Sequence, residues 1–474
     1  MSLRSVEGSQ AVSASAAATR RAFLKQAALI SAAAGTPLIV PSSVFGANAP
    51  NNRIQVGFIC CGNQSTIDLP AFLGHPDCQV LAVCDVNTAS HGYRTPDQFL
   101  GRKPAQEKVN AFYAERRPSG AYRGCDAYND FRDVLARRDL DAVAIVVPDH
   151  WHALMVVMAA KASKDMYCEK PLSLTVRQGQ AMVKAVREHK RILQTGSHYR
   201  SSPDNRRGCE LVRNGRIGQV KRILTQVAEI NAVDPGPGWQ PMPVPEGFDY
   251  ELWLGPAPWA PYHKDRCLYR FRFNLDYSGG QVTNFGAHSN DAAQWALGLD
   301  QSGPVELEDL GAEWPLPGGL YNTATKTAFR ARYANGVELV CQTDKPGFGI
   351  RFEGTEGWIE YGYQGLKTYP ESLKTSPIGP NETHLPMSNP DRTHEANQYH
   401  IPDHVRNFLD AVKSRRDPVA PVEVGHRSAT VCHLGNIAMR LKRKLRWDPV
   451  LELFPDDEEA NRLLTRPLRA PWQL

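Results

Sequence analysis

The stretch RIQVGFICCGNQS, Arg53–Ser65, decides the fold of this chain. Its first eight residues form a short, largely apolar run, which predicts a buried β-strand. Similar short apolar runs follow along the chain, separated by helical stretches, at QVLAVCD (79–85), DAVAIVVP (141–148), MYCE (166–169) and RILQT (191–195). Repeated strand–helix–strand units of this length predict a doubly wound parallel sheet, a Rossmann domain, over residues 51–200.

The pattern of apolar and polar residues changes after Arg200. Runs such as VKRILTQVAEI (220–230) and KTAFRARYA (326–334) alternate apolar and polar residues, which favours an antiparallel or mixed sheet. We therefore predict an α/β protein whose second domain, residues 201–474, is α+β. A segment rich in proline and tryptophan, residues 234–262, either walls a pocket or forms a long ordered surface loop.

The first fifty residues have the pattern of an export signal. TRRAFLKQAALISAAAGTPLIV (19–40) places paired arginines before a moderately apolar run that lacks the polar periodicity of an ordinary amphipathic helix. We predict a twin-arginine signal and linker over residues 1–50 and a periplasmic protein, tethered to the membrane only if the signal stays uncleaved. Because such passengers fold before export, the ten cysteines, which include no C-x-x-C pair, predict reduced thiols.

Charge and residue spacing exclude other classes of protein. Three of the five formal net positive charges lie within the first fifty residues, so the remainder has too little basic excess to predict nucleic-acid binding. His and Cys spacings typical of metal sites are absent from the sequence, and we predict no metal site.

The loop after the first strand departs from the G-x-G-x-x-G dinucleotide pattern. On that frame the three glycine positions are Cys60, Gly62 and Ser65. Gly62 keeps the position where the backbone approaches a pyrophosphate, and Asn63 and Gln64 supply donors near a helix N-terminus. Asp85 ends the second strand, where a carboxylate accepts from a ribose 2′-hydroxyl and repels a 2′-phosphate. The loop alone leaves dinucleotide binding open, whereas Asp85 favours NAD over NADP.

Three separated motifs carry a resemblance. AIVVPDHWHA (144–153), CEKPLSLT (168–175) and NFGAHSNDAAQWALG (284–298) together resemble the glucose–fructose oxidoreductase, inositol dehydrogenase and MocA family. The resemblance implies a Rossmann domain that binds a nicotinamide cofactor, NAD here, and a C-terminal domain with an open-faced, mostly antiparallel sheet. It also implies a carbohydrate or polyol substrate, and a homodimer or homotetramer that covers the open sheet.

The resemblance also assigns site residues. Lys170 and His288 match the family's catalytic lysine and histidine; a cation stabilises negative charge on a reacting oxygen, and an imidazole can carry the proton. An exposed loop lysine and a structural histidine are the alternatives. We place Pro148, His152 and Glu169 beside the cofactor, although Asp149, His150 and His152 could instead bond one another. Asn284 stands where inositol dehydrogenase-like members carry an aspartate, so it can only hydrogen-bond substrate.

Other candidate residues lie near these. Asp291, three residues after His288, shares a helix face with it and could orient its ring or touch substrate. Arg200 and Tyr199, with the adjacent His198, end the Rossmann portion and are predicted to contact substrate.

The sequence thus predicts an exported NAD-dependent oxidoreductase for a sugar, polyol or glycoside, with a tightly bound and recycled cofactor. Two alternatives remain open: a glycosidase that oxidises, eliminates and then reduces, and a non-catalytic sugar-binding protein.

Overall fold

The first part of the fold is a six-stranded sheet. The structure is a computed structural model that describes residues 52–343, 349–362, 365–389 and 400–474, so the predicted export signal lies outside the described residues. All strand pairs of this sheet are parallel, in the order β3-β2-β1-β4-β5-β6, which confirms the predicted doubly wound sheet. The strands are β1 (Ile54–Ile59), β2 (Cys78–Cys84), β3 (Asp126–Tyr128), β4 (Ala142–Ile145), β5 (Asp165–Cys168) and β6 (Leu193–Thr195).

Helices cover both faces of this sheet, which is why its strands are continuous apolar runs. One face packs on α4 (Phe131–Ala136), α5 (Asp149–Lys161) and α6 (Val176–Glu188). The other face packs on α2 (Ser65–Leu73) and α3 (Arg102–Ala114). The strand order reverses between β1 and β4, and ligands of such sheets bind at the carboxyl ends of the strands at this point.

The second sheet has eight strands in the order β13-β12-β11-β7-β10-β9-β8-β14. Only β7 and β10 pair in parallel among its described strands, so the sheet is mixed and mostly antiparallel. The strands are β7 (Val220–Gln226), β8 (Glu306–Asp309), β9 (Ala328–Arg332), β10 (Glu338–Gln342), β11 (Gly349–Gly354), β12 (Trp358–Gly362), β13 (Lys367–Tyr369) and β14 (Leu445–Arg446).

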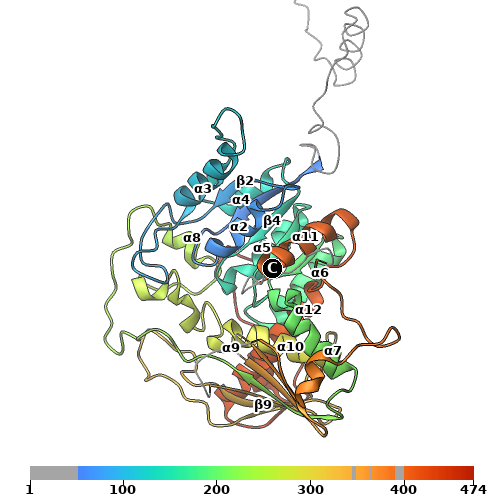
Figure 1. The fold of residues 1–474 in the computed structure, drawn as a ribbon. Helices are drawn as coiled ribbons and strands as arrows, with labels where there is room; N and C mark the ends of the chain where they lie inside the picture. Colours follow the sequence, from blue (N-terminus) through green and yellow to red (C-terminus); the bar gives the residue numbers. More distant parts are fainter. Residues whose placement is uncertain (1–51, 344–348, 363–364, 390–399) are drawn as a thin grey trace, which may run out of the picture. The chain divides into compact units, whose positions relative to one another are not determined.

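One face of the second sheet is packed and the other is open. Alternate side chains of its central strands are buried, in a core shared with α7 (Pro203–Arg213), α10 (Gly286–Leu297) and α12 (Val422–Leu441) (Figure 1). The intervening side chains are partly exposed and form ion pairs such as Arg222–Glu353 and Arg332–Glu338. This alternation agrees with the predicted open-faced sheet.

A helix from late in the sequence returns to the first sheet. The buried side chains of α11 (Ile401–Ser414) belong to the same core as β1 and α2, and Figure 1 shows α11 beside the Rossmann sheet. The ring of Phe408 lies 6.2 Å from that of Phe72, and Arg406 pairs with Asp77 at 2.7 Å. Part of the predicted C-terminal domain therefore completes the Rossmann core.

Most of the remaining short elements lie between β7 and β8 in the sequence. The remaining elements are α8 (Tyr250–Leu254), α9 (Gln281–Asn284) and α13 (Glu458–Arg462), with 3-10 helices at His198–Ser201, Lys264–Arg266, Arg270–Phe273 and Glu371–Thr375. No described helix has the length and apolarity needed to cross a membrane. All ten cysteines are free thiols.

Candidate active site

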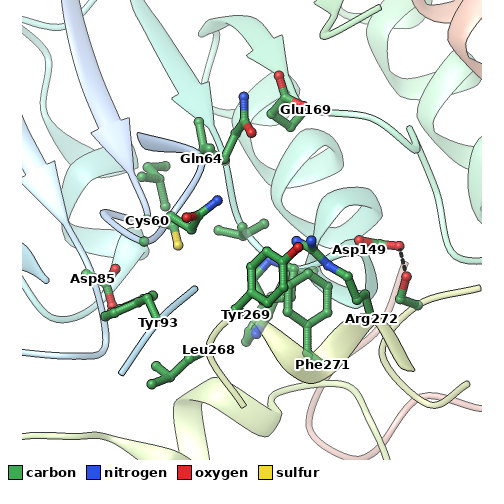
Figure 2. Close-up of a pocket in the computed structure, with 18 of the residues that line it drawn as sticks. Cys60, Gln64, Asp85, Tyr93, Asp149, Glu169, Leu268, Tyr269, Phe271 and Arg272 are labelled. Carbon is green, nitrogen blue, oxygen red and sulfur yellow. Dashed lines mark hydrogen bonds between the residues drawn. The ribbon is translucent and has the colours of Figure 1, made fainter. Parts of the chain in front are cut away.

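A cleft of about 300 Å³ opens at the carboxyl ends of β1, β2, β4 and β5. Residues from both parts of the fold line it. Figure 2 shows Cys60, Asp85 and Tyr93 at one end of the cleft and Asp149 and Arg272 at the other. Of the predicted site residues, these line the cleft: Cys60, Gly62, Asn63, Gln64, Asp85, Pro148, Glu169, Lys170, Tyr199, Asn284 and His288.

The β1–α2 turn keeps the shape of a dinucleotide loop despite its missing glycines. Cys60 adopts a left-handed φ of 75°, a conformation that glycine takes without strain, and its amide donates to the Cys84 carbonyl at 2.7 Å. In the described part of the chain, the main-chain N–H groups of Asn63 and Gln64 donate to no backbone carbonyl. These amides therefore remain available to an anion such as a pyrophosphate.

Two side-chain hydroxyl groups donate hydrogen bonds to main-chain carbonyls of this turn. Ser65, at the third glycine position, donates from Oγ to the Gly62 carbonyl at 2.6 Å, and Thr66 donates to the Asn63 carbonyl at 2.7 Å. The two hydroxyls therefore brace the turn. A Cβ at Gly62 would stand 3.1 Å from the ring of Tyr93, so close packing favours glycine there.

Asp85 occupies the expected place at the end of β2. Its two carboxylate oxygens accept from the amides of Cys61 at 2.6 Å and Asn87 at 2.7 Å. These bonds hold the carboxylate in position while it lines the cleft. Burial raises its pKa. The arrangement suits an acceptor for ribose hydroxyls and disfavours a 2′-phosphate.

His152 supports the cleft from behind. It is fully buried, and its ring nitrogens contact the carbonyls of Pro171 at 2.7 Å and Val147 at 2.9 Å. The ring thus joins the turn before α5 to the loop after β5, which carries Lys170. His150 instead contacts the Trp253 carbonyl and Asp149 contacts Ser278, so these three residues do not bond one another.

Lys170 reaches across the cleft to the C-terminal part of the fold. Its Nζ donates to the main-chain oxygen of Asn284 at 3.0 Å and to Oδ1 at 3.3 Å. Burial lowers the pKa of Lys170, whereas neighbouring Glu169 opposes that shift. Glu169 is itself buried, and its pKa rises to about 7. Lys170 is therefore held in the cleft and does not extend into solvent as an ordinary loop lysine would.

His288 lies among aromatic rings next to Lys170. Its ring centroid is 4.6 Å from that of Tyr199 and 4.8 Å from that of His198. Burial lowers the pKa of His288 well below its ordinary value, and the charge of Lys170 adds to this effect. The imidazole is therefore neutral at neutral pH, a state in which it can accept a proton, but it is a weaker base than a free imidazole.

Two predicted substrate residues are placed elsewhere. Arg200 and Asp291 form a buried ion pair, with Arg200 nitrogens 2.8–3.0 Å from both carboxylate oxygens. Asp291 also accepts from Ser428, and Arg200 also contacts Asp300. Neither residue lines the cleft. They join α10 to the end of the Rossmann portion, because a buried arginine needs a carboxylate partner, and their contact with substrate stays a prediction.

Several lining residues were not assigned to the site from the sequence, among them Tyr93, Asp149, Tyr269 and Arg272. The sequence contains an indication that Asp149 belongs to the site, because this residue follows the end of a strand and begins α5. Its buried carboxylate accepts from Ser278 Oγ at 2.5 Å, and burial raises its pKa to about 6. Residues of the predicted pocket wall, Phe248, Leu252 and Trp253, also line the cleft, whereas Trp259 is exposed. The segment is thus partly wall and partly surface.

Comparison with known proteins gives two family matches. Residues 54–197 match the Gfo/Idh/MocA model described as "Oxidoreductase family, NAD-binding Rossmann fold". Residues 237–474 match the model described as "Oxidoreductase family, C-terminal alpha/beta domain".

Individual relatives are more distant. The levoglucosan dehydrogenase of Pseudarthrobacter phenanthrenivorans is 24% identical over 259 residues, which cover 50% of this chain and 59% of the relative. A glycosyl hydrolase family 109 protein of Shewanella baltica is 31% identical over 138 residues, 29% of this chain and 27% of the relative. The chain therefore covers less than two thirds of the length of these relatives.

A solved structure supports the same fold. Levoglucosan dehydrogenase in complex with NADH and levoglucosan superposes with a TM-score of 0.58 at 17% identity, over 83% of this chain and 99% of that one.

Proposed function

The chain belongs to the Gfo/Idh/MocA oxidoreductase family, and from this premise we propose that it oxidises a hydroxyl of a sugar, polyol or related glycoside with NAD. The contact of Lys170 with Asn284 carries the proposal, because it fixes a cation at the meeting point of the Rossmann cleft and the C-terminal residues. A substrate hydroxyl beside Lys170 would also be close to His288, which lines the same cleft.

The residues present fit NAD. The amides of Asn63 and Gln64 would hold the pyrophosphate, and Asp85 would accept from the adenosine ribose. Pro148 and Glu169 line the cleft beyond them. When bound, NAD supplies an acceptor for the hydride that leaves the substrate carbon. NADP is disfavoured because Asp85 would face its 2′-phosphate.

The chain's own residues handle the proton. Lys170 stabilises negative charge that develops on the substrate oxygen, and neutral His288 accepts the proton. Asn284 cannot take a proton at neutral pH, so its two oxygen contacts position Lys170. The family's Lys–Asp–His trio is thereby reduced to two titrating groups and one positioning amide.

We also propose that the protein works outside the cytoplasm. The paired arginines and apolar run at 19–40 support export in the folded state, with NAD loaded before transport and retained afterwards. An uncleaved signal would keep the protein tethered to the membrane. A retained cofactor must be recycled in place, by a second substrate or by reduction of the oxidised sugar after elimination. A homodimer or homotetramer would cover the open sheet face.

The resemblance to a family 109 glycosyl hydrolase protein supports one alternative, in which the cofactor is recycled within a net hydrolysis. The two functions differ in their products. An accumulated keto sugar indicates net oxidation, whereas a released aglycone without net NADH indicates hydrolysis.

The test uses the exported protein. Its nicotinamide content is read by ultraviolet absorbance after denaturation, and turnover is measured after extensive dialysis with a panel of sugars, polyols and aryl glycosides. Retained nicotinamide and turnover without added NAD support the proposal. Stoichiometric consumption of added NAD with none retained would leave an ordinary dehydrogenase. Absence of nicotinamide, of a thermal shift with NAD and of any turnover would indicate a sugar-binding protein.

A further inference from the structure

Arg272 is a cation inside the cleft that the proposed chemistry does not use. It belongs to the 3-10 helix Arg270–Phe273, whose last residue, Phe273, is fully buried in the core. Figure 2 shows the Arg272 side chain extending toward Asp149, at the end of the cleft opposite Cys60 and Asp85. Since Asp85 marks the adenosine end, Arg272 lies at the substrate end.

The guanidinium of Arg272 is packed against aromatic rings and is not paired with a carboxylate among the described residues. Its Cζ lies 4.0 Å from the centroid of the Tyr269 ring and 5.5 Å from that of Phe271. Among the residues that the structure describes, no carboxylate oxygen lies within 4.0 Å of its guanidinium nitrogens. Arg270, two residues earlier, pairs with Asp265, and buried Arg200 has two carboxylate partners. Arg272, which is partly buried, therefore lies in the cleft without a carboxylate partner among the described residues.

Among the described residues, the other charged groups that face this end of the cleft do not serve as a carboxylate partner for Arg272. Asp149 attracts Arg272, but its Oδ2 accepts from Ser278, and its carboxylate oxygens lie more than 4.0 Å from the guanidinium nitrogens. Glu169 lies beside Lys170 and contacts the Lys170 amide. Lys170 is engaged with Asn284, and Arg94 adds a further positive charge 6.0 Å from the Tyr269 ring. Arg94 is exposed, so Lys170 and Arg272 are the two cations held by contacts within the cleft, and only Lys170 is needed at the reacting hydroxyl.

We propose that Arg272, stacked on Tyr269, binds a carboxylate of the substrate, so that the substrate class is a sugar acid such as a uronate or aldonate. The planar guanidinium matches a carboxylate with two parallel hydrogen bonds, and stacking against one aromatic face pre-orients it for this contact. Lys170 then meets the hydroxyl to be oxidised while Arg272 meets the acid group. This inference rests on the proposed oxidoreductase function and specifies its substrate.

The test measures binding separately from turnover. NAD-loaded protein is titrated with D-glucuronate and D-gluconate, with D-glucose as the neutral probe and D-glucose 6-phosphate as the phosphate probe, and thermal stability gives apparent Kd values. We expect at least one sugar acid to bind about tenfold or more tighter than glucose, the size of a charge-assisted hydrogen bond. Arg272→Gln should remove this preference, and Arg272→Lys should restore only part of it.

Arg270→Gln is the matched control, because it removes a neighbouring arginine that is already paired and 42% exposed. It should keep the preference for acids. Equal binding of acid and neutral sugar, no shift with either acid, or a preference that survives Arg272→Gln would overturn the proposal. Selective binding of glucose 6-phosphate would also overturn it, in favour of a sugar phosphate. Oxidation of neutral polyols with no acid preference would leave the proposed function standing and remove only this inference.

Discussion

Lys170 Nζ donates to both oxygens of Asn284, the main-chain oxygen at 3.0 Å and Oδ1 at 3.3 Å. The contact joins the loop after β5 to α9, so the cation stands between the two parts of the fold. An amide partner fixes the position of the ammonium without neutralising it. The charge therefore remains available to a substrate oxygen, which a carboxylate at this place would partly cancel.

Lys170→Ala should lower turnover by about 100-fold or more, because it removes the stabilisation of developing negative charge on the substrate. The measurement is kcat on the sugar or polyol that the wild-type protein oxidises, with circular dichroism to check the fold. Lys161→Ala, at the exposed end of α5, is the control and should leave turnover unchanged. Near-normal turnover of the Lys170 variant would remove this residue from the mechanism.

Cys60→Gly should stabilise the protein by about 0.5–1 kcal/mol, because the left-handed φ of 75° strains a residue with a Cβ. Urea unfolding gives the free energy, and NAD affinity should be equal or tighter. Cys60→Ala keeps the Cβ and loses only the thiol, so it should show no such gain. A tenfold loss of NAD affinity in the glycine variant would instead reveal a role for the thiol.

Asp85→Asn should weaken NAD binding by about 1–3 kcal/mol, since the amide offers only one oxygen where the carboxylate serves two backbone amides and the ribose. NADP binding should be less affected because a repulsive charge is lost. Calorimetric titration with both cofactors checks this, with Asp97→Asn in the exposed loop as control. Equal losses for NAD and NADP would place Asp85 outside the ribose site.

Acid should destabilise the fold through His404. Its buried ring contacts the Thr195 carbonyl from Nε2 at 2.8 Å and Ser201 Oγ from Nδ1 at 2.7 Å, and burial lowers its pKa to about 4. The unfolded chain takes up this proton near pH 6.5 and the folded chain only near 4. The unfolded state therefore binds more protons between these values, and stability falls as pH drops, by about 3 kcal/mol at most.

The measurement for His404 is urea unfolding of the wild type and His404→Gln at pH 7 and pH 4.5. The glutamine variant is expected to be less stable at pH 7 but to lose less on acidification. An equal acid loss in both proteins would assign the pH dependence to other buried histidines.

The sequence alone determined the architecture and the positions of the central groups. Buried parallel strands must be apolar on both faces, so the run from Arg53 and its successors indicated the doubly wound sheet before any contact was known. Gly62 and Asp85 belong to one strand–helix–strand unit, which places them together at the carboxyl edge of neighbouring strands. Lys170 and His288 were found from motifs whose local geometry brings each of them into the cleft.

Only the tertiary structure decided which distant groups meet. The apolar stripe of α11 would suit either sheet, and it is the fit of Phe408 against Phe72 that places this helix on the first. Asp291 shares a helix face with His288, yet its carboxylate turns to Arg200, because a buried guanidinium binds it more strongly than a neutral ring would. Arg272 and Asp149 lie more than a hundred residues apart in the sequence. Their meeting depends on long-range packing, which local periodicity does not encode.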